Sequence, residues 1–155
     1  MFTYQYPRAA ITTDAIVYVR KRKSNNSDTN LKLLFESTSV LLIQRGQDPY
    51  KNKWALPGGF IEMNETLEVS CKRELLEETG LEVDNMIQFK TYDAINRDPR
   101  HRTISVVFFT ELEKEEVVKG GDDAAQAKWF PFNRLPELAF DHGQILDEFF
   151  NTIGK

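Results

Sequence analysis

Residues 58–81 read GGFIEMNETLEVSCKRELLEETGL, and this stretch decides the fold. Its middle predicts a helix over 64–79, because Asn64 and Thr66 are both candidate N-caps and Gly80 is typical of the position just after a helix. We therefore expect one well-defined helix here, with a capped start and an end at a glycine.

Three carboxylates share one face of this predicted helix. Glu74, Glu77 and Glu78 are spaced i, i+3 and i+4, which places them within an arc of about 100°. Like charges at this spacing weaken an isolated helix, and a divalent cation between them would offset the repulsion. Carboxylate oxygens are ligands that Mg²⁺ and Mn²⁺ prefer. The residues alone leave two interpretations open, a solvated acidic face and a metal site.

The spacing around these acids favours the metal site. It resembles, at every fixed position, the signature of the Nudix hydrolases. The matching residues are Gly59, Glu65, Arg73, Glu74, Leu75, Glu77, Glu78, Gly80 and Leu81. The preceding residues 54–59 (WALPGG) also resemble the usual approach to that signature. The resemblance implies an α/β (α+β) fold, namely a Nudix-type αβα sandwich with a mixed β-sheet and a loop–helix–loop Nudix box.

The resemblance also implies roles for the site residues. Glu74, Glu77 and Glu78 match the acidic metal ligands of a hydrolase that cleaves nucleoside diphosphates linked to another moiety, with Mg²⁺ as cofactor and Mn²⁺ as the alternative. Metal ions would neutralise the pyrophosphate and lower the pKa of bound water, and a Glu could accept a proton from that water. The remaining matches are Gly58, whose carbonyl would bind metal, Gly59, which would let the backbone approach the phosphates, and Glu65 with Arg73, an orienting ion pair.

Residues 92–110 (YDAINRDPRHRTISVVFFT) narrow the substrate class. Their arginines precede a predicted strand, and a guanidinium suits phosphate. From the residues alone, this stretch is either an anion site or a polar turn organised by Asp98 and Pro99. Its pattern resembles a Nudix subgroup tied to NAD metabolism, which includes ADP-ribose pyrophosphatases and ADP-ribose-sensing transcriptional regulators. The resemblance implies that the substrate is bound by Arg97, Arg100 and Arg102.

The expected reaction is therefore hydrolysis of ADP-ribose to AMP and ribose 5-phosphate. One alternative is hydrolysis of nucleoside triphosphates, including oxidised ones. Another is a non-catalytic sensor of an ADP-ribose-type ligand, against which the intact acidic box argues, because sensing does not require three metal-binding carboxylates. His101 and His142 are expected to be surface or hydrogen-bonding residues, and the general base is left open.

The rest of the chain surrounds the box with strands and one further helix. β-Branched and apolar stretches predict strands at 11–19, 31–35, 40–44, 86–92, 103–110 and 127–131. A polar loop is expected at 20–30, and residues 45–60 read as loop. A last helix is predicted over 141–153, with Asp141 as its cap and a hydrophobic staple between Phe140 and Ile145.

Length and composition fit a single domain over residues 1–155. Apolar residues make up 41% and charged residues 28%, and the net charge of −4 argues against a general nucleic-acid binder. The single cysteine excludes an internal disulfide and fits a reducing compartment. No apolar run approaches the roughly 20 residues that span a bilayer. We expect a cytoplasmic protein with a small nucleotide substrate and no membrane or nucleic-acid partner, and leave monomer and homodimer open.

Overall fold

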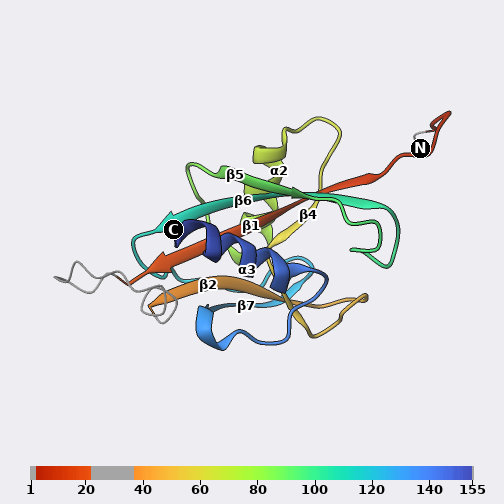
Figure 1. The fold of residues 1–155 in the computed structure, drawn as a ribbon. Coiled ribbons are helices and arrows are strands. Elements are labelled where there is room, and N and C mark those ends of the chain that lie inside the picture. Colours follow the sequence, from red (N-terminus) through yellow and green to blue (C-terminus); the bar gives the residue numbers. More distant parts are fainter. Residues whose placement is uncertain (1–2, 22–36, 155) are drawn as a thin grey trace.

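The computed structural model describes residues 3–21 and 37–154 (Figure 1). The strand predicted at 31–35 and most of the loop predicted at 20–30 lie outside the described residues. Within the described part, no helix is long and apolar enough to cross a membrane.

One mixed sheet organises the described residues. Its strands are β1 (Ala10–Arg20), β2 (Thr38–Arg45), β3 (Trp54–Ala55), β4 (Gly58–Phe60), β5 (Ile87–Tyr92), β6 (Thr103–Leu112) and β7 (Ala124–Pro131). The order is β3-β2-β1-β6-β5, with β4 paired to β1 and β7 paired to β2. Only the β1–β6 pair is parallel among these pairings, so the predicted mixed sheet is confirmed.

Helices cover both faces of this sheet, α2 (Leu67–Thr79) on one and α3 (His142–Ile153) on the other (Figure 1). Alternate residues of β1 divide between them, because successive side chains of a strand point to opposite faces. Ala15 and Val17 pack in the core cluster that includes α2, whereas Ile16 and Tyr18 pack with α3. The αβα sandwich expected from the resemblance is therefore confirmed. A short 3₁₀ helix, η1 (Phe132–Arg134), follows β7.

The predicted helix in the box forms, but it begins three residues later than expected. Thr66 is its N-cap and accepts a hydrogen bond from the Val69 amide at 3.3 Å, so the helix starts at Leu67. Asn64 is not the cap, because the preceding residues form a turn in which the Glu65 carboxylate accepts from the Glu62 amide at 2.7 Å. The helix ends as predicted at Gly80, whose φ of 73° lies in the left-handed region.

The predicted start of the terminal helix is correct in position and wrong in mechanism. α3 begins at His142 after Asp141, but the Asp141 side chain makes no cap hydrogen bond. The predicted staple does not form either, since Phe140 packs with the cluster on the α2 face and Ile145 lies in the cluster on the α3 face. Phe140 instead meets the ring of Tyr50, with 4.8 Å between their centroids.

Residues 45–60 contain two short strands that sequence reasoning read as loop. β3 and β4 flank Pro57 and are only two and three residues long, shorter than the strands that periodicity detects. β4 places Gly58 opposite Asp14 of β1, where a Cβ would lie 2.1 Å from the Thr13 carbonyl oxygen. Glycine is therefore required at this position, which brings the backbone before α2 directly onto the central strand.

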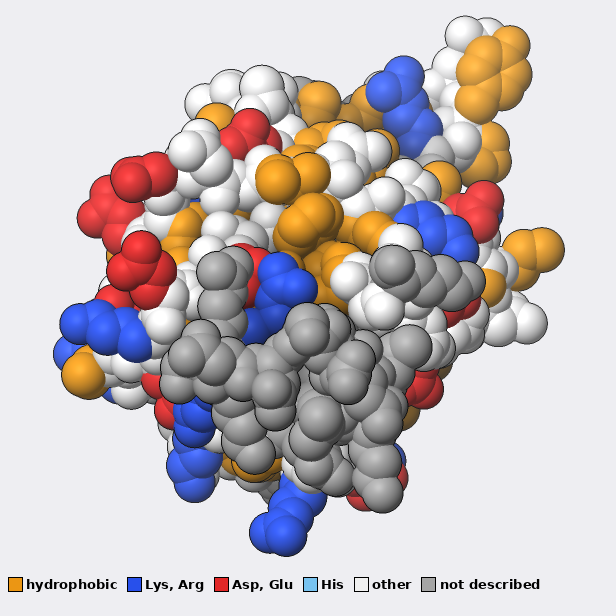
Figure 2. Space-filling model, turned by 60° about the vertical axis from the view of Figure 1, so that its left-hand side comes forward, with side chains coloured by type: hydrophobic (Ala, Val, Ile, Leu, Met, Phe, Trp, Pro, Cys, Tyr) orange, Lys and Arg blue, Asp and Glu red, His pale blue; other side chains and the backbone are white. Residues whose placement is uncertain are grey.

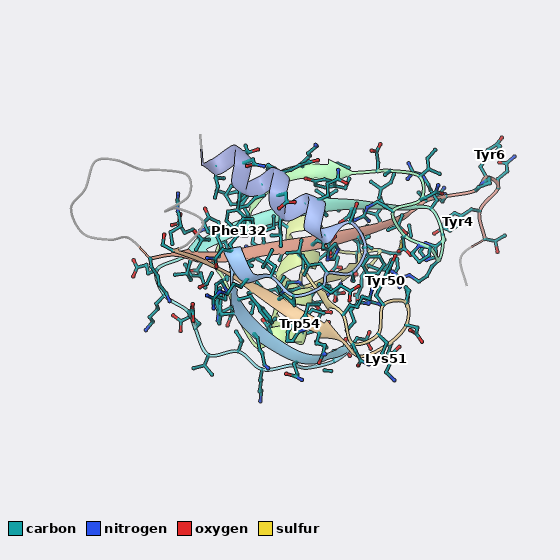
Figure 3. The ribbon with its side chains drawn as sticks, turned by 60° about the horizontal axis from the view of Figure 1, so that its bottom comes forward. Tyr4, Tyr6, Tyr50, Lys51, Trp54 and Phe132 are labelled. Carbon is teal, nitrogen blue, oxygen red and sulfur yellow. The ribbon has the colours of Figure 1, made fainter. Side chains whose placement is uncertain are left out.

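The residues before β1 and the connection between β2 and β3 lie outside the strands of the sheet. Figure 3 shows Tyr6 on an N-terminal segment that extends beyond the sheet, and Tyr50 and Lys51 on the connection between β2 and β3. On the face that Figure 2 presents, basic and acidic side chains are interspersed over the described part of the surface.

Candidate active site

A cleft of about 260 Å³ opens where β4, the end of β2 and the start of α3 meet. Glu74 and Glu78 of α2 both line it, together with Gly58 and Gly59. The two acids lie on one face of α2, and the two glycines lie in β4, which pairs with β1. Both parts of the box therefore meet in this cleft.

Glu78 is the most deeply placed carboxylate of the box, with 6% of the residue exposed. Its Oε2 accepts a hydrogen bond from the Gly58 amide at 2.9 Å. Burial raises its pKa to about 8, assisted by the negative charges of Glu74 and Asp14 and opposed by the Gly58 hydrogen bond. A carboxyl group with such a pKa can exchange a proton near neutral pH.

Glu74 lies directly over Gly59. A Cβ on Gly59 would stand 2.5–2.6 Å from the Glu74 carboxylate, so any larger residue would displace that group. Burial raises the Glu74 pKa, while the adjacent Arg73 lowers it. The close approach of Glu74 to β4 therefore depends on the absence of a side chain at position 59.

Arg73 joins the remaining acids of the box. Its Nε and Nη2 contact the two Glu65 carboxylate oxygens at 2.9 and 2.7 Å, so the predicted Glu65–Arg73 pair forms. Its Nη1 also reaches Glu74 at 2.8 Å and Glu77 at 3.2 Å. The hydrogen bonds from Arg73 hold the pKa of Glu65 down at about 2. Glu77 is therefore drawn toward Arg73, and its side chain is 41% exposed.

The donor set suits a hard divalent cation. The buried carboxylate of Glu78 and the half-buried carboxylate of Glu74 meet the Gly58–Gly59 backbone in one cleft, and oxygen donors are what Mg²⁺ and Mn²⁺ prefer. Among residues 3–21 and 37–154, no three acidic, histidine or cysteine side chains already form a closed metal-binding group. Glu77 does not line this cleft, and its carboxylate contacts Arg73 at 3.2 Å.

The predicted arginines divide between two different places. Arg97 and Arg100 line the cleft, but Arg102 does not. Arg102 donates from Nη1 to the carbonyls of Asp93 and Ala94 at 2.7 and 3.3 Å, and it lines a separate cavity beside the N-terminal segment. The structure therefore does not bring Arg102 together with the other predicted site residues.

Arg97 and Arg100 differ in how free they are to meet a ligand. Arg97 is almost fully buried, with its side chain 4% exposed, and it forms an ion pair with Asp141. Arg100 contacts both carboxylate oxygens of Asp98 at 3.0 and 2.8 Å, and its side chain is 35% exposed. Arg100 is thus the predicted arginine that presents the most accessible charge to the cleft.

Sequence reasoning missed a third cleft arginine. Arg45, the last residue of β2, lies with its guanidinium 4.9 Å from the Phe140 ring centroid, and that of Arg100 lies 5.6 Å from the same ring. Burial lowers the Arg45 pKa, and the charge of Arg100 lowers it further. Arg100 also lies 5.2 Å from the Phe60 centroid. The cations Arg45 and Arg100 and the rings of Phe60 and Phe140 therefore share the cleft with the carboxylates.

Asp14 and His142 are two further cleft residues to which sequence reasoning gave no site role. Asp14 is 7% exposed and accepts a hydrogen bond from the Ser105 hydroxyl. His142 Nε2 lies 3.6 Å from Asp14 Oδ1, and burial lowers the His142 pKa. An aspartate within the apolar run ITTDAIVYV was the available signal, because a buried carboxylate is rarely left without a partner.

Two acids from a distant loop also reach the cleft. Asp122 and Asp123, which precede β7, both line it. Asp122 has a φ of 50°, and Asp123 Oδ1 accepts from Gln47 Nε2 at 3.3 Å. These residues were considered in the sequence together with the acidic run at 111–116, and the structure places the aspartates in the cleft.

A family model and several known proteins resemble this chain. Residues 29–149 match the NUDIX domain family. The ADP-ribose pyrophosphatase of Methanocaldococcus jannaschii is 42% identical over 117 residues, which cover 76% of this chain and 69% of that protein. The MutT/nudix family protein from Enterococcus faecalis aligns with a TM-score of 0.80 and 29% identity, covering 99% of this chain and 65% of that one.

A further solved structure is the NUDIX domain of Shewanella oneidensis NrtR complexed with ADP ribose. It aligns with a TM-score of 0.78 and 25% identity, over 96% of this chain and 90% of that one. The family match covers most of the chain, including the whole acidic box, and so confirms the family that the spacing of the acids indicated. The chain therefore belongs to the Nudix family of hydrolases.

Proposed function

We propose that this Nudix hydrolase cleaves ADP-ribose with water to AMP and ribose 5-phosphate, in a Mg²⁺-dependent reaction. The observation that carries the proposal is one cleft holding the carboxylates of Glu74 and Glu78 together with the cations Arg45 and Arg100. The M. jannaschii relative is an ADP-ribose pyrophosphatase, and the S. oneidensis domain was solved with ADP ribose. Both support the substrate class.

The residues that would hold the cation are Glu74, Glu78, Glu77 and the backbone of Gly58. Members of this family use divalent metal ions, and we propose Mg²⁺ here, with Mn²⁺ as the alternative. When bound, such a cation neutralises phosphate charge and lowers the pKa of water. Arg73 keeps Glu74 in place through its 2.8 Å contact, and Glu65 in turn fixes Arg73.

Glu78, in its ionised form, is the residue we propose to take the proton from the attacking water, and a bound cation would favour that ionised form over the protonated form of the metal-free protein. Its carboxylate is buried and oriented by the Gly58 amide, which leaves its other oxygen for the cleft. Water adds to one phosphorus as the bridging P–O bond breaks, and the displaced phosphate leaves with that bridging oxygen. A correctly placed carboxylate contributes about 10²- to 10⁴-fold to such a proton transfer.

Arg45 and Arg100 would hold the anionic substrate. Their guanidiniums lie on the same ring, Phe140, and the repulsion that lowers the Arg45 pKa would be relieved by a phosphate between them. Phe60 and Phe140 add apolar surface at which a base or ribose can pack. This arrangement suits a substrate with two phosphates and an aromatic base.

We propose a small-molecule ligand as the partner of this cleft, and no nucleic acid. The net charge of −4 supports this, since general nucleic-acid binders are basic. Hydrolysis of nucleoside triphosphates and ligand sensing without turnover are the alternatives. A metal-supplemented substrate panel separates them: ADP-ribose yields AMP and ribose 5-phosphate, a nucleoside triphosphate yields a monophosphate and pyrophosphate, and a sensor yields no product.

A further inference from the structure

Residues 56–58, which precede α2 in the chain, are each hydrogen-bonded to a different element. The Ala15 amide donates to the Pro57 carbonyl at 2.8 Å, and the Gly58 amide donates to Glu78 at 2.9 Å. The amide of Leu56 donates to the imidazole Nδ1 of His142 at 2.9 Å, in a fully buried contact. One strand and both helices therefore converge on three consecutive residues.

His142 belongs to none of the elements on which the acidic box is built. It is the first residue of α3, on the opposite face of the sheet from α2, and it is 4% exposed. Its hydrogen bond to Leu56 spans 86 positions in the chain. Because Nδ1 accepts a hydrogen bond there, the proton of the neutral ring resides on Nε2, the atom that lies 3.6 Å from Asp14 Oδ1.

We infer that His142 is a positioning residue for the Nudix reaction: its Nδ1 fixes the Leu56 amide and thereby sets the Gly58–Gly59 backbone under Glu74 and Glu78. Only Pro57, whose φ is locked by its ring, separates Leu56 from Gly58. A displacement of Leu56 is therefore passed on to the Gly58 amide that orients Glu78.

The tight contacts of the two glycines make the site sensitive to such a displacement. A Cβ built on Gly58 would come within 2.7 Å of Asp14 Oδ1, and one built on Gly59 within 2.5 Å of the Glu74 carboxylate. These backbone atoms thus lie as close to the acids as glycine allows. Misplacement of reacting groups by about 1 Å can cost on the order of 10²-fold in rate.

Two substitutions of His142 by amide residues distinguish the Nδ1 contact with Leu56 from the Nε2 contact with Asp14. His142→Asn places an amide oxygen near the position of Nδ1, where it can accept from Leu56, but does not reach Asp14. His142→Gln extends toward Asp14 and offers no acceptor at the Nδ1 position. His142→Ala removes both contacts. Gln144→Ala is a matched control on the first turn of α3, because Gln144 is exposed and bonds only to Glu148 at 3.0 Å among its described contacts.

The kinetic test rests on the proposed function and compares kcat and KM for ADP-ribose with Mg²⁺. We expect His142→Ala and His142→Gln to lower kcat by at least about tenfold with KM within about threefold, as for lost transition-state placement. His142→Asn should restore kcat to within about threefold of wild type, and Gln144→Ala should leave it unchanged. Rescue by Gln in place of Asn, or full activity of His142→Ala, would overturn the inference.

A second readout is independent of catalysis, and its wild-type part is independent of any variant's folding. The chain has two histidines, so the ¹⁵N spectrum of the wild-type imidazoles contains two rings to assign. We expect a neutral His142 with its proton on Nε2 and slow hydrogen exchange at the Leu56 amide, which becomes fast in His142→Ala and stays slow in His142→Asn. A proton on Nδ1, or fast exchange at Leu56 in wild type, would overturn the inference. Failure of ADP-ribose turnover with these signals intact would instead count against the proposed function.

Discussion

The guanidinium of Arg97 forms a bidentate ion pair with the carboxylate of Asp141, with Nε 2.9 Å from Oδ2 and Nη2 2.7 Å from Oδ1. This pair joins the connection between β5 and β6 to the start of α3, across 44 positions of the chain. It also accounts for both departures from the sequence prediction in this region, because Asp141 does not cap its helix and Arg97 does not have a free guanidinium.

Arg97→Ala is therefore expected to act mainly on stability. The substitution leaves the Asp141 carboxylate without its partner, and breaking a buried pair in this way costs about 3 kcal/mol of the free energy of unfolding. Denaturant unfolding measures the loss. The comparison is Arg102→Ala, which removes only exposed contacts to carbonyls and should cost about 1 kcal/mol or less. A folded Arg97→Ala of wild-type stability with impaired turnover would reassign Arg97 to direct substrate contact.

Arg45→Ala and Arg100→Ala are expected to act mainly on the substrate. A charge-assisted hydrogen bond is worth about 1.5–3 kcal/mol, so each loss should lower kcat/KM for ADP-ribose by roughly 10- to 150-fold. Steady-state kinetics on variants of verified stability provide the measurement. Arg102→Ala, whose side chain lies outside the cleft, should change kcat/KM by about twofold or less. An equal effect of all three substitutions would contradict the location of the anion site.

Glu78→Gln should lower kcat by at least about 10²-fold, the low end for loss of a general base, and should also alter the pH dependence of stability. The folded pKa of Glu78, about 8, lies above its ordinary value of 4.5, so the folded protein holds a proton that the unfolded chain releases. That contribution to stability is complete below about pH 4.5 and is lost as pH rises toward 8.

The pH effect is measured on metal-free protein between about pH 5.5 and 8, above the range in which the depressed carboxylates Glu65, Asp98 and Glu148 titrate. Over this interval the free energy of unfolding should fall more steeply in wild type than in Glu78→Gln. Parallel curves for the two proteins would contradict the buried, protonated state of Glu78.

Glu65→Gln tests the orienting pair of the box. A neutral amide cannot hold Arg73 through two charged contacts. Arg73 should then no longer fix the position of the Glu74 carboxylate, which it contacts at 2.8 Å. Loss of a group that orients metal ligands typically costs 10- to 100-fold in activity or metal affinity, and we expect a fall of about that size in kcat at saturating Mg²⁺. Glu68→Gln is the control, since Glu68 pairs with Lys72 on the same helix and is exposed. Equal activities of Glu65→Gln and Glu68→Gln would show that the Glu65–Arg73 pair has no orienting role in the reaction.

The parts of the fold and site that were predictable from the sequence are those set by local chemistry. The periodicity of the acids, the cap at Thr66 and the glycine at position 80 concern neighbouring residues, and the structure contains the helix they define. The Glu65–Arg73 pair was predictable because its two members lie within one signature of fixed spacing. The strands β1, β2, β5, β6 and β7 followed from β-branched and apolar runs.

The remaining features depend on contacts between distant segments. Arg45 ends an apolar strand, and nothing near it in the chain indicates that it meets Phe140, 95 residues further on. Asp141 had the right residue type for a cap, but a guanidinium from another element competes for its carboxylate. β3 and β4 are too short for a period to show, and they exist because β1 and β2 supply their hydrogen bonds.

The most direct test of the account is the product analysis of ADP-ribose hydrolysis. Purified protein is incubated with ADP-ribose, or with nucleoside triphosphates, in the presence of Mg²⁺ and after chelation. The account predicts that AMP and ribose 5-phosphate form in equal amounts, that chelation abolishes their formation, and that kcat/KM for ADP-ribose exceeds that for every triphosphate. Pyrophosphate release from a triphosphate at a higher kcat/KM, or ADP-ribose bound without turnover in the presence of Mg²⁺, would contradict it.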